Sequence, residues 1–201
     1  MGNLLSKVGH SKAEKADSHG RIVRAAAKRI RESGIDSLGV AEIMRAAGLT
    51  HGGFYKHFAD RDQLIDEAVE QAMLENEVEA TEVVSGAEDP LAAFARWYVS
   101  TAHRDDPANG CGVAALSADI PHATGPAQES YRAQVERYLS RLHELLADDD
   151  PEVSRRANVT LSAMVGALMI ARALGPTDRS DELLRDVFEA VESRRLLPPR
   201  S

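Results

Sequence analysis

The sequence predicts an all-α protein, on three observations. Apolar residues recur at intervals of three and four along most of the 201 residues, which is the period of an amphipathic helix. Clusters of Gly, Pro, Ser and Asp separate these stretches, as expected of helix ends. No sustained strand-type alternation of apolar and polar residues is present. Because aromatic residues make up only 4% of the chain, the core must be built mainly from aliphatic side chains.

Three helices are expected in the first 57 residues. The first covers Arg21–Arg31, where the apolar residues form one stripe and the basic residues lie off it. Ser37 is placed to cap a second helix, which ends at Gly48 after about ten residues. A very short third helix follows from Leu49 to about His57. The shortness of the last two helices sets this segment apart from the rest of the chain.

The remainder of the chain is also predicted to be helical. Asp60 begins a long helix, with Gln63 in the capping-box position, that continues to about Val84. Prolines at or near the starts of later stretches fit first helical turns, where a missing N–H costs no hydrogen bond. Further helices are expected over residues 90–103, 113–119, 125–147, 151–174 and 180–194.

The net charge of −8 is unevenly distributed along the chain. Residues 1–61 carry 11 Lys and Arg against 6 Asp and Glu, a net charge of +5, whereas residues 62–201 have a net charge of −13. A basic front on an acidic body indicates that the front alone meets a polyanion such as nucleic acid. On charge alone, random scatter remains an alternative.

Cysteine and hydropathy patterns exclude several classes. A single cysteine, Cys111, forms neither an intramolecular disulfide nor a cysteine-based zinc site, and the seven histidines lack metal-ligand spacing. No metal and no cofactor are therefore expected. The longest uncharged run, residues 157–171, is shorter than the ~18 residues that indicate a membrane span. We therefore expect a cytoplasmic protein that does not enter a membrane.

The residues from 37 to 58 predict a helix-turn-helix. Two short helices meet at a turn in which Gly48 suits a left-handed backbone. Helical spacing sends Phe54 and Phe58 into the core and leaves hydroxyl, imidazole, phenol and ammonium groups outside, which can contact phosphates and base edges. Gly52 and Gly53 each cost about 1 kcal/mol in a helix, so they indicate a close approach of the backbone to another surface. An ordinary helical corner is the alternative.

Residues 21–73 closely resemble the DNA-binding domain of the TetR family of transcriptional regulators. The resemblance rests on Gly48-Leu49-Thr50, on Phe54-Tyr55-Lys56-His57-Phe58, and on Phe58-x-Asp60-Arg61-Asp62-x-Leu64. It implies contacts with double-stranded operator DNA from the second short helix and a phosphate contact from Arg61. His51 stands where the family often has Arg. The candidate DNA-binding residues are Ser37, Thr50, His51, Gly52, Tyr55, Lys56, His57 and Arg61.

The resemblance also implies how the chain is divided. Residues 1–16 are expected to be a flexible arm, residues 17–63 the DNA-binding domain and residues 64–197 a helical domain for ligand binding and dimerisation. The segment from Asn109 to Leu116 looks like the "GC" segment of one TetR subgroup, although this motif is weak. Each candidate pocket residue could instead be plain core; they are Trp97, Tyr98, Thr101, Cys111, Tyr131, Met164 and Met169.

The apolar helix near residue 165 indicates a homodimer. Residues 159–171 are apolar nearly all round, so they must be buried on more than one face. Small residues among them allow a second helix to approach closely, and a later stripe near residues 183–191 supplies a second helix for a four-helix interface. A helix central to a monomeric core is the alternative. The candidate interface residues are Ser162, Gly166, Ile170, Leu184 and Phe188.

These features favour a ligand-responsive regulator that a small-molecule inducer of unknown identity releases from its operator. The alternatives are a thiol sensor that responds to oxidants or electrophiles through Cys111, a regulator without a small-molecule ligand, and an activator. An enzyme that uses Cys111 with His103 or His122 is disfavoured, because no nucleophile motif surrounds the cysteine. No catalytic residue is therefore assigned.

Overall fold

The fold is built from helices alone over the part of the chain that the computed structural model describes, residues 12–146 and 152–196. The all-α prediction is confirmed. The α-helices are α1 (Lys12–Ser33), α2 (Val40–Ala46), α3 (Arg61–Val84), α4 (Pro90–Tyr98), α5 (Thr101–Asp105), α6 (Gly112–Leu116), α7 (Gly125–Leu146), α8 (Val153–Leu174) and α9 (Asp178–Glu192). The 3-10 helices are η1 (Ile35–Ser37), η2 (His51–Lys56), η3 (Pro107–Asn109) and η4 (Ile120–His122).

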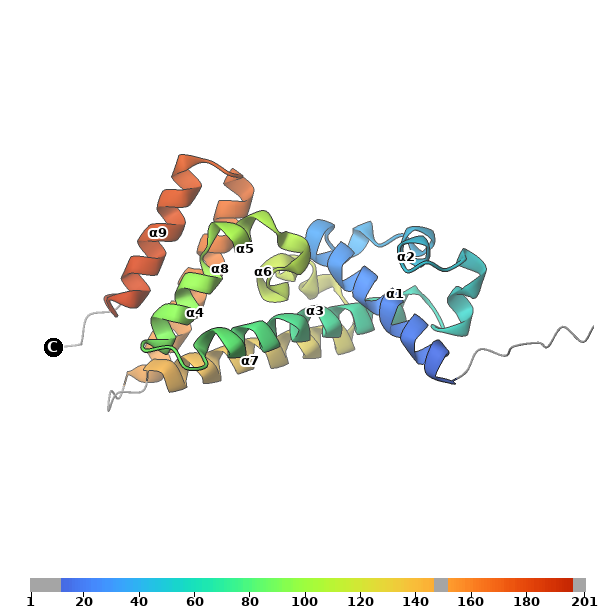
Figure 1. The fold of residues 1–201 in the computed structure, drawn as a ribbon, viewed down its shortest axis with the longest axis horizontal. Coiled ribbons are helices and arrows are strands. Elements are labelled where there is room, and N and C mark those ends of the chain that lie inside the picture. The colour runs from blue at the N-terminus through green and yellow to red at the C-terminus, as the bar shows by residue number, and fades with distance from the viewer. Residues whose placement is uncertain (1–11, 147–151, 197–201) are drawn as a thin grey trace, which may run out of the picture.

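The N-terminal end of the molecule is formed by α1, α2, η2 and the start of α3, at the right of Figure 1. The stripe of α1 predicted from the sequence is buried, with Ile22 and Ile30 fully covered. Helix α1 begins at Lys12, so residues 12–16 are helical and do not belong to a flexible arm. The sequence reasoning followed the apolar stripe, which starts at Ile22, and overlooked the good helix formers before it. Residues 1–11 of the predicted arm lie outside the described residues.

Ser37 does not cap the second helix. It ends the 3-10 helix η1, and its Oγ donates to the Gly34 carbonyl oxygen at 2.7 Å. Helix α2 begins three residues later, with Gly39 at its N-cap and no side-chain cap. The short-range bond within η1 therefore takes the hydroxyl that the sequence assigned to α2.

Helix α3 connects the two ends of the molecule and runs beside α7 (Figure 1). Its N-cap is Asp60, whose carboxylate accepts from the Gln63 N–H at 2.9 Å, as the sequence predicts. Farther along, Glu77 accepts from Gln134 of α7 at 3.0 Å and pairs with Arg141 of the same helix. The predicted boundary between residues 63 and 64 falls in the first turn of α3, so this helix belongs to both parts of the molecule.

The C-terminal body contains α4 to α9 around a core continuous with that of the N-terminal end. The single helix predicted over residues 90–103 is two helices, because the chain turns at Val99 and Ser100. Ser100 caps α5 by accepting from the His103 N–H at 3.1 Å. The predicted turn at residues 148–151 lies outside the described residues.

Helix α8 is the one helix in the described ranges that is long and apolar enough to cross a membrane by length and composition. One face of it is core: Ala157, Met164 and Leu168 are buried, and the helix packs against α6, α7 and α9. Its apolar character therefore has a structural explanation within the fold.

Candidate DNA-binding surface and ligand cleft

The turn between α2 and η2 is held by one glycine and one arginine. Gly48 has a φ of 75°, in the left-handed region that the sequence predicts for this position. Arg21 of α1 donates from Nη1 to the Ala47 carbonyl oxygen at 2.9 Å, and the Leu49 N–H donates to the Met44 carbonyl oxygen at 2.8 Å. These bonds fix the direction in which the chain leaves α2. The sequence analysis did not assign this role to Arg21.

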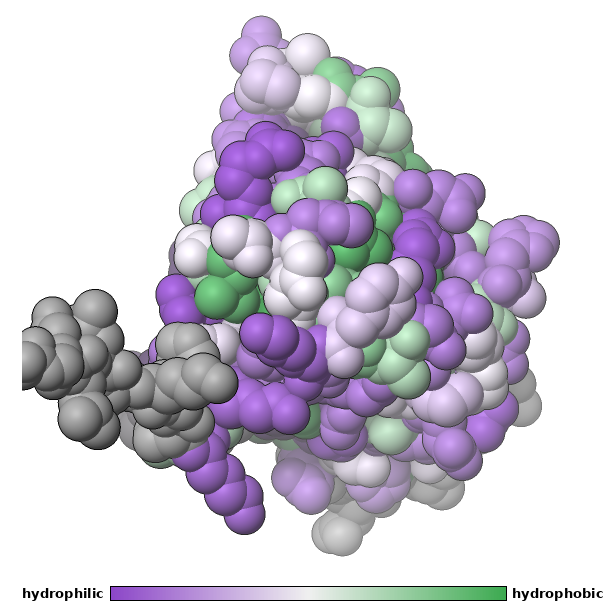
Figure 2. Space-filling model, turned by 90° about the vertical axis from the view of Figure 1, so that its right-hand side faces the viewer, coloured by the Kyte–Doolittle hydropathy of each residue, from purple (hydrophilic) through white to green (hydrophobic). Residues whose placement is uncertain are grey.

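The recognition segment, residues 50–57, places its phenylalanine ring inward and most of its polar side chains outward. Phe54 is buried and stacks on Phe58, with ring centroids 5.4 Å apart. Tyr55 is 77% exposed, and its ring packs edge-on against Phe54, which limits its orientation. The end of the molecule that carries this segment is largely hydrophilic (Figure 2). The exposed side chains of the segment are Thr50, His51, Tyr55 and Lys56.

The two glycines of the recognition segment have different surroundings. A Cβ added at Gly53 would lie 3.5 Å from Met44 Cε, in ordinary contact with the core. A Cβ added at Gly52 would have no heavy atom of the described chain within 4 Å. The described chain therefore leaves room for a side chain at Gly52.

His57 and Arg61 are less free than the sequence suggests. The ring of His57 lies with its centroid 6.0 Å from that of His19, and burial, followed by the charges of His19, Lys15 and Lys56, lowers its pKa. Arg61 donates from Nη2 to the Ile35 carbonyl oxygen at 3.0 Å and from Nε to the Leu38 carbonyl oxygen at 3.2 Å. Arg61 therefore ties the start of α3 to the chain before α2, and its phosphate contact stays a prediction.

A family model for the bacterial regulatory proteins of the tetR family matches residues 22–68. Residues 22–68 are a TetR-family DNA-binding domain. The match runs from the first buried residue of α1 to the second turn of α3, and it confirms the recognition made from the Gly48-Leu49-Thr50 and Phe54–Phe58 motifs. The chain therefore carries the DNA-binding part of a transcriptional regulator. No curated protein sequence matches the chain.

Solved structures share the fold beyond this domain. A TetR transcriptional regulator from Chloroflexus aurantiacus is 21% identical, with a TM-score of 0.77 over 90% of this chain and 96% of its own. A TetR-family transcriptional regulator from Streptomyces coelicolor is 22% identical, with a TM-score of 0.73 over 89% and 94%. The reduced form of NemR from E. coli is 18% identical, with a TM-score of 0.73 over 88% and 96%. At these identities the likeness shows the fold alone.

Three of the predicted pocket residues belong to the core. Cys111 and Met164 are fully buried, as is Tyr98, whose Oη donates to Cys111 Sγ at 3.2 Å. Tyr138 Oη lies 3.5 Å from the same sulfur, and burial raises the pKa of both phenols. Aromatic rings therefore pack around the cysteine in this structure, and the role of these residues in ligand binding stays a prediction.

The other predicted pocket residues are scattered. Thr101 and Met169 are exposed, and Tyr131 is half-buried with its hydroxyl donating to the Val113 carbonyl oxygen at 3.2 Å. Trp97 is half-buried and lines a cleft of about 200 Å³ between α3, α4, α5 and η3. Its other lining residues are Asn76, Glu79, Ser100, Ala102, His103, Asp106, Asn109 and Gly110.

His103 joins this cleft to the buried cysteine. Its Nδ1 lies 2.7 Å from the Tyr98 carbonyl oxygen, which can only accept, so Nδ1 carries the proton. Its Nε2 accepts from the Cys111 N–H at 2.8 Å. Burial, followed by the charge of Arg172, lowers the pKa of His103 to about 4, so the ring is neutral at pH 7. An enzyme with Cys111 as its nucleophile would need a base beside the thiol. Since both ring nitrogens of His103 are engaged, this residue is not available as that base.

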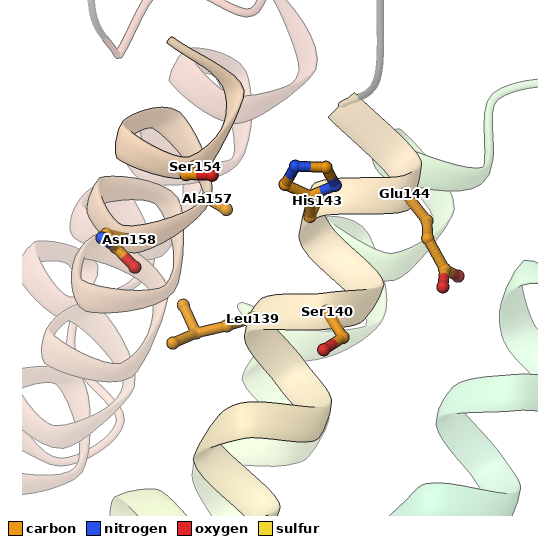
Figure 3. A pocket seen from close by; sticks show the side chains of 7 residues that line it. All are labelled: Leu139, Ser140, His143, Glu144, Ser154, Ala157 and Asn158. Carbon is orange, nitrogen blue, oxygen red and sulfur yellow. The ribbon is translucent and has the colours of Figure 1, made fainter. Parts of the chain in front are cut away.

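A second hollow lies between α7 and α8, and its volume is about 440 Å³. Leu139 of α7 and Ala157 of α8 point toward each other in it, whereas Glu144 points away (Figure 3). Most of its lining side chains are exposed, including His143 and Asn158. It is a shallow surface groove and contains none of the predicted pocket residues. Among the described residues no group of three His, Cys, Asp or Glu is placed to hold a metal ion.

The outward face of α8 is apolar and uncovered in the protomer. Ile170 is 52% exposed and Leu174 44%, and Ser162 lies on the exposed side as well. A Cβ added at Gly166 would have no heavy atom of the described chain within 4 Å. The sequence predicted burial on more than one face, and a single protomer buries one.

The predicted interface residues of α9 require a correction. Leu184 is 2% exposed, so it belongs to the protomer's own core and is not available to a partner subunit. Phe188 is half-buried, and the Arg96 guanidinium of α4 lies over its ring at 4.4 Å. Both residues lie on the stripe that α9 turns toward α4 and α8, which an amphipathic pattern cannot distinguish from a stripe facing another subunit.

Arg31 is a functional candidate that the sequence analysis missed. This residue of α1 has a fully buried side chain and pairs with Glu75 of α3 at 2.5 Å. Its Nε donates to the Ala108 carbonyl oxygen of η3 at 2.7 Å. One guanidinium therefore holds the DNA-binding domain, the connecting helix and a wall of the cleft together. Arg31 lies off the apolar stripe of α1, so the neighbouring sequence does not predict that its side chain is buried.

Proposed function

We propose that the protein is a dimeric, cytoplasmic transcriptional repressor that binds operator DNA through the recognition segment and is released by a small molecule. The observation that carries the DNA-binding part is the recognition segment itself. It presents hydroxyl, imidazole, phenol and ammonium groups around Gly52, where the protomer leaves open space. Such groups contact phosphates and base edges, and a glycine lets the backbone approach the duplex closely.

The outward face of α8 supports the dimer. Exposed apolar side chains on one helix face favour association because burial removes them from water. The absence of a side chain at Gly166 allows the same helix of a second copy to approach closely. A homodimer pairs this surface with itself, and two recognition segments then meet two half-sites on the operator. We expect the interface to be centred on Ser162, Gly166 and Ile170.

The link through Arg31 supports a response to a ligand. The cleft wall at η3 is bonded to α1 by the guanidinium, and α1 belongs to the DNA-binding domain and packs on α2. A ligand that shifts η3 changes this contact and with it the position of the DNA-binding domain. Operator binding then depends on the ligand because the two protomers of a dimer must keep a fixed separation.

A thiol sensor is not favoured by the surroundings of Cys111. Its sulfur is fully buried between the hydroxyls of Tyr98 and Tyr138, whereas reactive cysteines are partly accessible. We therefore infer that the inducer acts without forming a bond to the thiol.

The dimer is tested with Gly166→Leu. Leucine is the better helix residue by up to about 1 kcal/mol, and the protomer offers it open space, so the variant should fold at least as well as the wild type. Between two closely packed helices the added side chain should cost about 1–3 kcal/mol, a loss in dimer affinity of roughly 5- to 150-fold. Sedimentation velocity across a concentration series measures this loss, and affinity for a selected operator should fall with it.

The matched control is Ala133→Leu, which places the same side chain at an exposed position of α7. It should leave both sedimentation and DNA binding unchanged. A wild-type protein that sediments as a monomer at micromolar concentration, or a Gly166→Leu dimer as tight as the wild type, would refute this interface.

A further inference from the structure

The cleft beside Trp97 contains a buried acceptor without a partner. Asn76 of α3 is 3% exposed, and its Nδ2 donates to the Asn109 carbonyl oxygen at 3.1 Å. Because that carbonyl can only accept, this bond identifies which atom of the Asn76 amide is Nδ2 and which is Oδ1. Oδ1 is buried and has no hydrogen-bond partner among the described residues. Such an atom costs free energy unless a donor reaches it.

The charged side chains that line the cleft are all acidic. Glu79 of α3 and Asp106 at the start of η3 bring two exposed carboxylates to its wall, and no Lys or Arg is among the described residues that line it. The His103 ring is neutral because burial, followed by the charge of Arg172, lowers its pKa, and both of its ring nitrogens are engaged in hydrogen bonds. The guanidinium of Arg172 lies behind Gly110, where its Nη2 donates to the His103 carbonyl oxygen at 2.9 Å.

The remaining wall is aromatic. The indole of Trp97 lines the cleft and is stacked on the His103 ring, with centroids 5.5 Å apart. An indole attracts a cation to its ring and packs well against an apolar group. The volume of about 200 Å³ is below the roughly 300–1,000 Å³ of typical ligand pockets, so the occupant is small.

We propose that this cleft binds a small organic ammonium ion whose N–H groups reach the unpaired Asn76 oxygen and the carboxylates of Glu79 and Asp106, with its apolar part against Trp97. An ammonium group brings several donors and a positive charge, and the cleft supplies acceptors, negative charge and an aromatic wall. An anionic ligand would be repelled by the two carboxylates, and no Lys or Arg among the described lining residues would pair with it. The inference rests on the proposed ligand response and names the class of its inducer.

The position of the cleft gives this ligand a way to act. Asp106 and Asn109 belong to the same short segment as Ala108, the residue bonded to Arg31. An ammonium ion that bridges Asp106 to the α3 side of the cleft draws η3 toward α3. That movement changes the Arg31 contact, which fastens α1 to η3.

Tryptophan fluorescence tests the proposal directly, because Trp97 is the one tryptophan of the chain. The full-length protein is titrated without DNA with 2-phenylethylammonium, with neutral 2-phenylethanol and with anionic phenylacetate. We expect a saturable change in tryptophan fluorescence with the ammonium ion, binding at least tenfold weaker with the alcohol, and no change with phenylacetate at the same concentrations.

The double variant Glu79→Gln, Asp106→Asn should bind the ammonium ion at least tenfold more weakly than the wild type does. Glu82→Gln, an exposed carboxylate on the same helix but outside the cleft, should bind it as the wild type does.

Two outcomes overturn the inference: equal binding of ammonium and alcohol, or wild-type binding by the double variant. A protein that shows no saturable change yet binds its operator also refutes the cleft site and leaves the DNA-binding function intact. Conversely, binding as predicted with no release of operator DNA upholds the ammonium site and refutes the proposed ligand response.

Discussion

Replacing Gly52 by leucine should abolish specific operator binding while leaving the protein folded. The protomer offers the new side chain open space, and leucine favours a helical backbone over glycine, so thermal stability should be unchanged or slightly higher. On DNA the same side chain stands between the recognition segment and the duplex. Affinity should then fall toward the non-specific level, a loss on the order of 10³-fold or more.

Fluorescence anisotropy with a labelled operator measures this loss, and thermal unfolding monitors the fold. The control is Ala133→Leu, which adds a leucine at an exposed position of α7, away from the recognition segment. A Gly52→Leu protein that binds the operator as tightly as the wild type would show that this surface does not meet DNA.

Replacing Gly112 by alanine should destabilise the whole molecule. This glycine opens α6 against the middle of α3, and an added Cβ would lie 2.9 Å from the Ala72 carbonyl oxygen and 2.9 Å from Met73 Cε. The backbone oxygen of a helix cannot move aside, so α6 must shift away from α3. Overpacking of this kind costs about 1–3 kcal/mol, which lowers Tm by roughly 2–12 °C in a chain of this size.

Calorimetry or circular dichroism gives the Tm of Gly112→Ala beside that of Gly125→Ala, whose added Cβ meets no heavy atom of the described chain within 4 Å. Gly125→Ala should change Tm by no more than about 2 °C, as surface substitutions typically do. Equal Tm values for the two variants would mean that α6 does not pack on α3 as described.

The helix-turn-helix could be predicted from the sequence because its signals are local. Gly48 requires a left-handed turn, and the spacing of Phe54 and Phe58 defines which side of the recognition segment is buried. Its exposed polar residues follow from the same spacing. The capping role predicted for Ser37 was wrong, because a bond to Gly34, three residues earlier, competes with helix capping.

The cleft and its link to the DNA-binding domain could not be predicted, because they depend on contacts between distant segments. Arg31 reaches Ala108, 77 residues away, and Asn76 reaches Asn109, 33 residues away. An off-stripe arginine and an asparagine within a helix look like solvent-exposed residues in the sequence. The aromatic rings near Cys111 were predicted to line a pocket, but composition does not tell a lined pocket from a filled core.

Selection of duplexes from a random DNA library by the purified full-length protein tests the central claim most directly. A dimer that reads DNA with two recognition segments should enrich an inverted repeat, with half-sites about one helical turn or a multiple of it apart. The Gly52→Leu protein, selected in parallel, should enrich no repeat. Enrichment of no sequence by the wild type, or of a single half-site without its inverted copy, would contradict a dimeric operator-binding regulator.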